Sequence, residues 1–407
     1  MIYVIAILLI LIGVYYYDYK KATQFKLFYW LLVCALLICI CGFRYRLGGD
    51  TPTYMQDFKT LHPLSKLRME DFSHSRYAPG FILFFSLCKE IYPDFAFFQI
   101  VHSLIFNSVI FYFIAKYSRN KYFAALIYFF FLYFIMSFQQ LREALAVCVF
   151  LLAWPAFRDR KWIWWYLASL LAFTFHLSAS IMFVLPLICL PGLREIFVFG
   201  RRTIFVCLFV AGVGYIIQKT FFQYIELLSL TQSISERAQS YSENDLGSST
   251  KNIIGSLVFF FNYAFYPLVI LILSKHPKIR NFEDEDRKDK GFTPFVLISI
   301  YFTIITLFIA ILGRYFNYFY PFTIVFLSNF LFRPFYILRK RFKLGFISWM
   351  IFFLPMFSIQ VYNNFLNTLN RAGTFRTYMQ YYPYNSIFDK GKDEQREKTI
   401  RYLRRRF

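Results

Sequence analysis

Residues 95–137 read FAFFQIVHSLIFNSVIFYFIAKYSRNKYFAALIYFFFLYFIMS, two apolar runs on either side of a turn with three basic residues. A helix rises about 1.5 Å per residue, so about 20 apolar residues span the roughly 30 Å of hydrocarbon in a bilayer. A backbone inside that layer must satisfy its own hydrogen bonds, which a helix does. This stretch therefore predicts two transmembrane helices joined by a short basic turn.

Runs of the same kind occupy most of the chain, which has 407 residues and is 58% hydrophobic and 23% aromatic. Soluble domains rarely exceed about half apolar residues. We predict an all-α, polytopic bundle of about 12–13 transmembrane helices, built as a single transmembrane domain over 1–407. The predicted crossings are 2–17, 26–43, 95–115, 122–137, 141–157, 162–177, 179–192, 203–218, 253–274, 293–312, 315–332 and 345–362.

Basic residues set the predicted orientation. The formal net charge is +22, and Lys and Arg gather in short turns between apolar runs, as the positive-inside rule requires of cytoplasmic turns. Because this rule accounts for the charge, we expect no nucleic-acid partner. Placing six basic turns in the cytoplasm puts the N-terminus outside. The segments 44–78 and 219–252 and the tail 363–407 then face outward, although the tail is itself strongly basic.

The run 79–92 leaves a second orientation open. It is short, opens with Pro79-Gly80 and contains Lys89 and Glu90. A re-entrant segment there agrees with the orientation just described, which we prefer. A thirteenth crossing would instead move the N-terminus inside and make 44–78 cytoplasmic. The first run lacks a preceding basic region and a small-residue cleavage site, so we expect a retained span rather than a signal peptide.

The sequence offers no pattern for a metal or a cofactor. None of the seven cysteines has the paired spacing of a zinc site, and all lie in or beside apolar runs, where cysteine is usually a small hydrophobe. Neither a phosphate-binding loop nor a zinc-hydrolase motif occurs. We therefore expect no disulfide, no metal ion and no cofactor.

Ionisable side chains near the apolar runs are the candidates for function, because each costs at least about 2.5–3.5 kcal/mol inside a membrane. Purely structural roles are the alternative: the arginines could be interfacial anchors, Arg142 could form an interhelical ion pair, and His176 could form a hydrogen bond in the core. The candidate stretches are GFRYRLGGDT (42–51), with Arg44, Arg46 and Asp50; QQLREA (139–144), with Arg142; FHLSA (175–179), with His176; and GRYFN (313–317), with Arg314.

In the preferred orientation, the four arginines and His176 lie toward the outward side. Guanidinium groups bind phosphate oxygens in a two-pronged manner and stay charged when desolvated. Several of them in a partly dry cavity predict a site for a phosphate-rich group, and a diphosphate carried on a membrane lipid is the natural ligand. We assign diphosphate binding to Arg142 and Arg314 first, with Arg44 and Arg46 in support. His176 is the first choice of general base and Asp50 the second.

The same stretches resemble the EpsG-like branch of the Wzy-type polysaccharide polymerases. The likeness rests on ordered short motifs that extend over most of the chain. They are Gly42-Phe43-Arg44 with Gly49-Asp50-Thr51 and Tyr54, Tyr77-Ala78-Pro79-Gly80-Phe81, Leu141-Arg142-Glu143-Ala144-Leu145-Ala146, Phe175-His176-Leu177-Ser178-Ala179, Arg314 to Tyr320, and Tyr382-Pro383-Tyr384.

This resemblance implies a membrane glycosyltransferase of the GT-C kind that acts on undecaprenyl-diphosphate-linked oligosaccharide. It would work in a bacterial inner membrane with its active site facing the periplasm. A growing glycan would move from its lipid carrier onto a new repeat unit, by an inverting and metal-independent step, and a chain-length regulator protein could be a partner. The alternatives are an O-antigen-type ligase and a lipid-linked oligosaccharide flippase or transporter.

Overall fold

The computed structural model describes residues 1–73, 75–217, 253–274, 291–339, 345–362, 364, 381 and 384–389. Its regular structure in these ranges is helical, apart from an isolated antiparallel bridge between Arg44 and Ser386. The predicted class is confirmed: the chain is an all-α, polytopic membrane protein. The predicted outward loop 219–252 and most of the tail 363–407 lie outside the described residues.

The chain forms two compact units. Unit 1 contains Met1–Phe183 and Phe353–Phe407, and unit 2 contains Val184–Phe352. The expectation of a single transmembrane domain stays a prediction.

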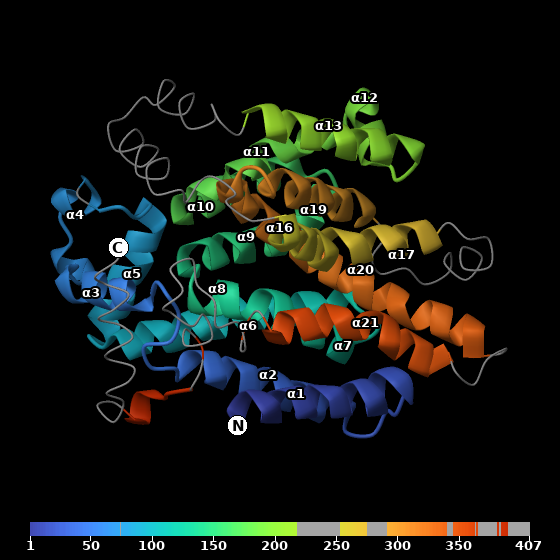
Figure 1. The fold of residues 1–407 in the computed structure, drawn as a ribbon. Helices are drawn as coiled ribbons and strands as arrows, with labels where there is room; N and C mark the ends of the chain where they lie inside the picture. The colour runs from blue at the N-terminus through green and yellow to red at the C-terminus, as the bar shows by residue number, and fades with distance from the viewer. Residues whose placement is uncertain are drawn as a thin grey trace. The chain divides into compact units, whose positions relative to one another are not determined.

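Most predicted crossings coincide with helices of the structure (Figure 1). In the first 176 residues these are α1 (Ile2–Gly13), continued by the π-helix η1 (Val14–Tyr19), α2 (Lys26–Gly42), α6 (Phe95–Tyr117), α7 (Lys121–Tyr128), η3 (Phe129–Tyr133), α8 (Phe134–Phe138), α9 (Leu141–Arg158) and α10 (Trp162–Phe175). Later in the chain they are α13 (Arg201–Ile217), α16 (Ile253–Phe260), η7 (Phe261–Phe265), α17 (Tyr266–Ser274), α19 (Thr293–Thr306), η8 (Ala310–Leu312), α20 (Gly313–Arg339) and α21 (Gly345–Val361).

Four of the described helices are long and apolar enough to cross a membrane: Ile2–Tyr19, Phe95–Tyr117, Lys121–Phe138 and Ile254–Ser274. Within the described residues, Leu177–Cys189 and Pro191–Phe197 add a fifth candidate if that bent pair is one span. The predicted total of about 12–13 crossings stays a prediction.

The predicted crossing 179–192 is not a continuous helix, and whether it crosses stays a prediction. The chain instead forms short pieces, and its direction changes by 100° between Leu177–Cys189 and Pro191–Phe197. Pro186 and Pro191 lie at the starts of two pieces. Proline has no backbone N–H and its ring clashes with the preceding turn, so it ends a helix here rather than continuing it. The pieces are η4 (Leu177–Ser180), α11 (Ile181–Val184), η5 (Leu185–Cys189), α12 (Pro191–Arg194) and η6 (Glu195–Phe197).

Residues 79–92 do not cross the membrane. They form α5 (Pro79–Ile91), whose 13 residues extend only about 20 Å. The helices before and after also meet at one end, because the Gln99 side chain near the start of α6 donates to the carbonyl oxygen of Gly42 at the end of α2, at 2.9 Å. The chain therefore leaves and re-enters the bundle on the same side, which excludes the thirteenth crossing within this part of the chain.

The segment between α2 and α6 is folded rather than an open loop. It contains α3 (Thr51–Thr60), η2 (Leu64–Lys66) and α4 (Met69–Ser73), followed by α5, and these helices gather at one end of α6 in Figure 1. Phe58, Phe81 and Phe85 pack there against Phe95 and Phe98 in a buried cluster. We call α3, η2, α4 and α5 the end-cap segment.

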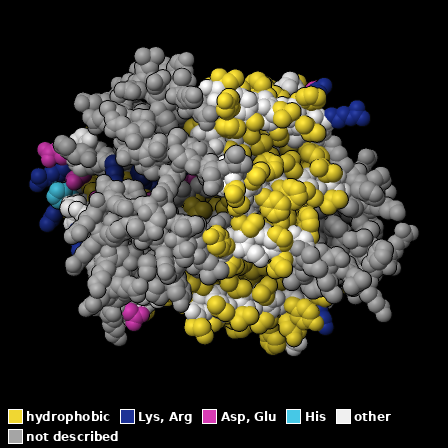
Figure 2. Space-filling view, in the orientation of Figure 1, with side chains coloured by type: hydrophobic (Ala, Val, Ile, Leu, Met, Phe, Trp, Pro, Cys, Tyr) yellow, Lys and Arg dark blue, Asp and Glu magenta, His cyan; other side chains and the backbone are white. Residues whose placement is uncertain are grey.

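Three basic turns lie together at the other end of unit 1. Lys21 Nζ donates to Asn120 Oδ1 at 3.0 Å, which joins the turn after η1 to the turn before α7. Arg158, at the end of α9, interacts electrostatically with Lys116. Exposed apolar side chains cover α1 and α2 between the two ends, and Figure 2 shows this surface in yellow at the bottom of the view. This distribution is typical of a bundle with a lipid-facing belt.

Candidate active site

A turn after α2 connects the bundle to the end-cap segment. Gly48 has φ +100°, a conformation that glycine adopts without strain. The hydroxyl of Thr51 donates to the carbonyl oxygens of Leu47, at 2.7 Å, and Phe138, at 3.2 Å. Phe138 is the last residue of α8. The turn 42–51 is therefore attached to the break between α8 and α9.

Arg44 is buried beneath this turn, with no solvent exposure. Its NH1 group donates to the carbonyl oxygen of Cys41 at 2.6 Å, and its guanidinium lies 4.8 Å from the centre of the Phe138 ring. Its Nε and NH2 groups have no hydrogen-bond partner in the described structure. The side chain stabilises the turn from inside and exposes no guanidinium surface to a ligand. No contact tests the predicted diphosphate role of Arg44, which stays a prediction.

Arg142 lies at the start of α9 and is half-buried. Its guanidinium lies 4.8 Å from the centre of the Tyr77 ring, and its Nε donates to the Tyr54 hydroxyl at 3.2 Å. The rings of Tyr54 and Tyr77 stack with their centres 5.7 Å apart. Because Arg142 is in the first turn of α9, its charge adds to the positive end of the helix dipole. Arg142 and this helix end together form a site suited to an anion.

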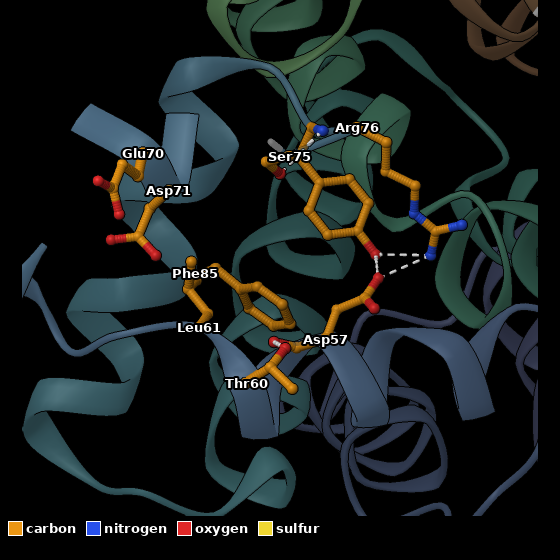
Figure 3. A pocket seen from close by; sticks show the side chains of 9 residues that line it. Asp57, Thr60, Leu61, Glu70, Asp71, Ser75, Arg76 and Phe85 are labelled. Carbon is orange, nitrogen blue, oxygen red and sulfur yellow. Dashed lines mark hydrogen bonds and ion pairs between the residues drawn. The ribbon is translucent and has the colours of Figure 1, made fainter. Parts of the chain in front are cut away.

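A charged network continues from Tyr77 into the end-cap segment (Figure 3). Asp57 accepts hydrogen bonds from the Tyr77 hydroxyl and, at 2.7 Å, from the NH2 group of Arg76. Desolvation is the main cause of the raised pKa of Tyr77, and the hydrogen bond to Asp57 adds to it. Desolvation likewise raises the pKa of Tyr54. Both phenols therefore stay protonated and act as donors near neutral pH.

Asp57 and Arg76 were missed by the sequence analysis, and Tyr54 and Tyr77 were given no role there. The tyrosines belong to motifs that carried the family resemblance. Nothing in the local pattern around Asp57 or Arg76 distinguishes them from ordinary charged residues of a solvated helix and loop. Their importance comes from the fold, which brings two residues 19 positions apart into contact.

His176 follows directly after α10 and is buried. Its Nδ1 accepts a hydrogen bond from the backbone N–H of Ser178 at 3.2 Å and lies 2.5 Å from the Ser178 hydroxyl. A neutral ring that accepts at Nδ1 carries its proton on Nε2. In this geometry, His176 therefore presents a donor at Nε2. The preceding Phe175 packs against the buried cluster that includes Tyr77 and Leu141.

The remaining predicted residues lie in two places. Asp50 is exposed at the start of α3, one helical turn before Tyr54, and it interacts electrostatically with the Tyr54 hydroxyl. Arg46 is partly buried, has φ +52° and stacks on Tyr45, with 5.1 Å between guanidinium and ring centre. Arg314 lies in the first turn of α20 in unit 2 and is partly buried. Arg142 and Asp50 thus both interact with the Tyr54 hydroxyl, while the roles of His176, Arg46 and Arg314 stay predictions.

Among the residues that the structure describes, no three His, Cys, Asp or Glu side chains group closely enough to hold a metal ion. The site is instead an arginine on an aromatic shelf, at the polar end of an apolar helix bundle.

Comparison with known families agrees with that description. A family model described as the EpsG family matches residues 27–386, which is most of the chain. The chain belongs to the EpsG family, and this membership indicates a polysaccharide-polymerase type of role in a membrane. Neither the curated proteins nor the solved structures contain a match.

Proposed function

We propose that the protein polymerises polyprenyl-diphosphate-linked repeat units. It moves the growing glycan from its lipid diphosphate onto the non-reducing end of a new lipid-linked repeat unit and releases undecaprenyl diphosphate. The reaction would occur at the periplasmic face of a bacterial inner membrane. The observation that carries this proposal is the position of Arg142, held by Tyr54 and Tyr77 at the positive end of α9.

The orientation of unit 1 supports the outward placement. The basic turns at 20–26, 116–121 and 158–161 lie at the end of α9 opposite to Arg142. By the positive-inside rule, that basic end belongs in the cytoplasm. The end-cap segment and the Arg142 site then face the periplasm, where lipid-linked glycans would be extended.

The proposed step forms a bond between an acceptor hydroxyl oxygen and the anomeric carbon, and it breaks the bond from that carbon to the diphosphate oxygen. Negative charge develops on the leaving diphosphate, so a preorganised guanidinium that binds it more tightly in the transition state lowers the barrier. Arg142 has this role in our proposal, and attack from the opposite side inverts the anomeric configuration. No metal ion takes part in the proposed step.

The acceptor hydroxyl must lose its proton to a base. Asp50, which is exposed and one turn from Tyr54, is suited to this role. His176 could take the proton only if its ring released the Ser178 amide and exposed an unprotonated nitrogen, because Nδ1 is already an acceptor. As a donor at Nε2, it would instead assist the leaving diphosphate or orient a sugar.

The test is a purified preparation incubated with defined undecaprenyl-diphosphate oligosaccharide, with the products separated on a gel. The wild-type protein should yield a ladder of chain lengths. Arg142→Lys keeps the charge but loses the planar fork, so its rate should fall by roughly 10²-fold or more. Arg158→Lys, at the far end of the same helix, is the matched control and should retain the ladder.

Two outcomes would contradict the proposal. Single-step capping of an acceptor, without a ladder, would indicate a ligase, and transport of lipid-linked oligosaccharide without new glycosidic bonds would indicate a flippase. A normal ladder from Arg142→Lys and from Arg142→Ala would remove Arg142 from the site.

Adding a candidate chain-length regulator to the same assay would show whether it alters the ladder.

A further inference from the structure

The end-cap segment contains an open pocket of about 450 Å³, which is within the roughly 300–1,000 Å³ typical of small-molecule sites. All of its lining residues come from residues 57–85, so it lies within unit 1. Figure 3 shows Glu70 and Asp71 on one side of the pocket and Asp57 and Arg76 on the other. Arg142 is not among its lining residues, so the diphosphate site does not account for the pocket.

Its lining has the chemistry of a site for polyhydroxylated ligands. Three carboxylates contribute, those of Asp57, Glu70 and Asp71, together with the side chains of Thr60 and Ser75. Carboxylate oxygens accept hydrogen bonds from sugar hydroxyls, and such charge-assisted bonds are about twice as strong as neutral ones. The partly buried Leu61 adds apolar surface to the lining, to which Tyr77 and Phe85 contribute little because both are buried.

Charge separates this pocket from the Arg142 site. The lining holds three carboxylates against one guanidinium, that of Arg76, which is paired with Asp57. The excess of negative charge disfavours a diphosphate or an acidic sugar by like-charge repulsion, whereas the carboxylates favour hydroxyl and ammonium donors. The described hydrogen bonds to the Asp57 carboxylate end on Oδ2, from the Tyr77 hydroxyl and the Arg76 guanidinium. These bonds hold the carboxylate in one orientation, and none of those described uses Oδ1. An oriented acceptor atom is therefore available at the pocket wall.

The two sites share a wall. Tyr77 lines the pocket while Arg142 lies on its ring, 4.8 Å from the ring centre. Arg76 lines the pocket, and its carbonyl oxygen accepts from the NH1 group of Arg142 at 3.4 Å. A sugar in the pocket would thus be separated from a diphosphate at Arg142 by a single side chain.

We infer that this pocket binds the terminal sugar of the incoming repeat unit, and that this sugar is a neutral or amino sugar rather than an acidic one. The inference rests on the proposed function, of which it names the acceptor subsite. Asp57 orients the sugar through Oδ1. The Tyr77 ring separates the sugar site from the neighbouring site for the diphosphate of the donor.

The experiment measures binding without turnover, so that it does not depend on polymerisation. The probes are methyl glycosides of glucose, galactose, N-acetylglucosamine, glucosamine and glucuronic acid, together with the oligosaccharide released from its lipid carrier by mild acid. Saturation-transfer NMR on the detergent-solubilised full chain reports weak binding of each. A polyprenyl diphosphate without sugar is titrated in parallel to report the Arg142 site.

Two variants alter the pocket. Thr60→Trp fills it from an exposed position at the end of α3, and Gln56→Trp, exposed one turn earlier and outside the pocket, is the matched control. Asp57→Asn removes the charge at constant shape. Both pocket variants should weaken the binding of neutral and amino sugars by about tenfold or more. Polyprenyl diphosphate should bind them as it binds the wild type, and Arg142→Ala should show the reverse pattern.

The failures are distinguishable. The inference would be overturned if Thr60→Trp and Asp57→Asn left sugar binding unchanged, or if the protein preferred the glucuronide. In either case, a polymer ladder from the wild type would still support the proposed function. Absence of binding by every probe sugar would also overturn it. Pocket-dependent sugar binding with no ladder from lipid-linked substrate would refute the proposed polymerase while the sugar site stands.

Discussion

Tyr77 combines three roles in one side chain. Its ring supports the Arg142 guanidinium, its hydroxyl donates to Asp57, and the residue belongs to the pocket lining. A cation over an aromatic ring contributes about 0.5–2 kcal/mol, more when desolvated. The hydroxyl contributes a further hydrogen bond to a charged acceptor, worth about 1.5–3 kcal/mol. The two contributions can be removed one at a time.

Substituting Tyr77→Phe keeps the shelf under Arg142 and removes only the hydroxyl. We expect the protein to lose about 1–3 kcal/mol of stability and to keep its polymerisation rate within roughly tenfold. Tyr77→Leu also removes the ring face, so its rate should fall further, by a factor typical of a lost cation–π contact. Initial rates and thermal unfolding in detergent measure the two effects. Equal polymerisation rates for the two variants would show that the Tyr77 ring does not support the Arg142 guanidinium during the reaction.

The backbone at Gly48 provides a second test at this scale. A Cβ atom there would approach the carbonyl oxygen of Phe138 to 2.3 Å, and φ is +100°. Gly48→Ala should therefore destabilise the protein by about 1–3 kcal/mol and lower the unfolding temperature. Gly212, in α13, has open space at its Cβ position, so Gly212→Ala is the control and should be neutral or slightly stabilising. Similar unfolding temperatures for both variants would refute the attachment of the turn to α8.

At the scale of elements, the end-cap segment is held by polar ties as well as by its aromatic core. Lys89 Nζ donates to the carbonyl oxygens of Phe58, Lys59 and Leu61. Glu90 accepts from the hydroxyl and the backbone N–H of Ser65. The exposed Leu83, Leu87 and Ile91 lie on one face of α5, at spacings of four, and form an apolar stripe. A helix with such a stripe and a polar end suits a re-entrant or interfacial position.

Acid should loosen the first part of this segment. The backbone N–H of Arg68 and then His62 lower the pKa of Asp71, and the hydrogen bonds from Ser65 lower the pKa of Glu90. A carboxylate with a depressed folded pKa contributes stability above its unfolded pKa, roughly 4. That stability is lost as the pH falls through the folded pKa. Hydrogen exchange at 62–71 should therefore accelerate below about pH 4.

The control is the double variant Asp71→Asn with Glu90→Gln, which cannot titrate at these two positions. Its exchange at 62–71 should be fast at pH 6 and should change little on acidification beyond the intrinsic effect of pH. An acid-induced acceleration as large as that of the wild type would show that other groups control the segment.

At the scale of the whole molecule, the described structure supports an orientation for unit 1 alone. Its basic turns lie at one end and its end-cap segment at the other, with an exposed apolar belt on α1 and α2 between them. Charge asymmetry of this kind orients a bundle during insertion. The Arg142 site and the sugar pocket therefore belong to the same side of the membrane.

A membrane-impermeant maleimide tests this orientation in intact spheroplasts. Ser65→Cys, in η2, should react from outside, whereas Asp159→Cys, in the turn after α9, should react only after permeabilisation. The unmodified protein is the control, since six of its seven cysteines lie within predicted crossings and the seventh, Cys88, is buried. The opposite labelling pattern would reverse the orientation and end the periplasmic proposal.

The helices themselves were largely predictable, because hydrophobic length is a local property that each run carries by itself. The end of the helix near Cys189 was missed because Pro186 and Pro191 were counted inside an apolar run. Arg142 was predictable as a site residue, since a charge at the edge of a membrane helix needs a reason. Arg44 had the same signal and lies completely buried, so the signal marks a constrained arginine without saying what constrains it.

The sequence alone determined that this chain is a helical membrane protein. It also determined which turns are basic and which arginines lie beside apolar runs, because hydropathy and charge are local properties of one or two helical turns. Only the tertiary structure decided that Tyr77 lies between Arg142 and Asp57 and that residues from 57–85 line an open pocket. Those contacts join residues that are far apart along the chain, and the packing of α3, α5 and α9 against α6 selects them. No local sequence pattern predicts these long-range contacts.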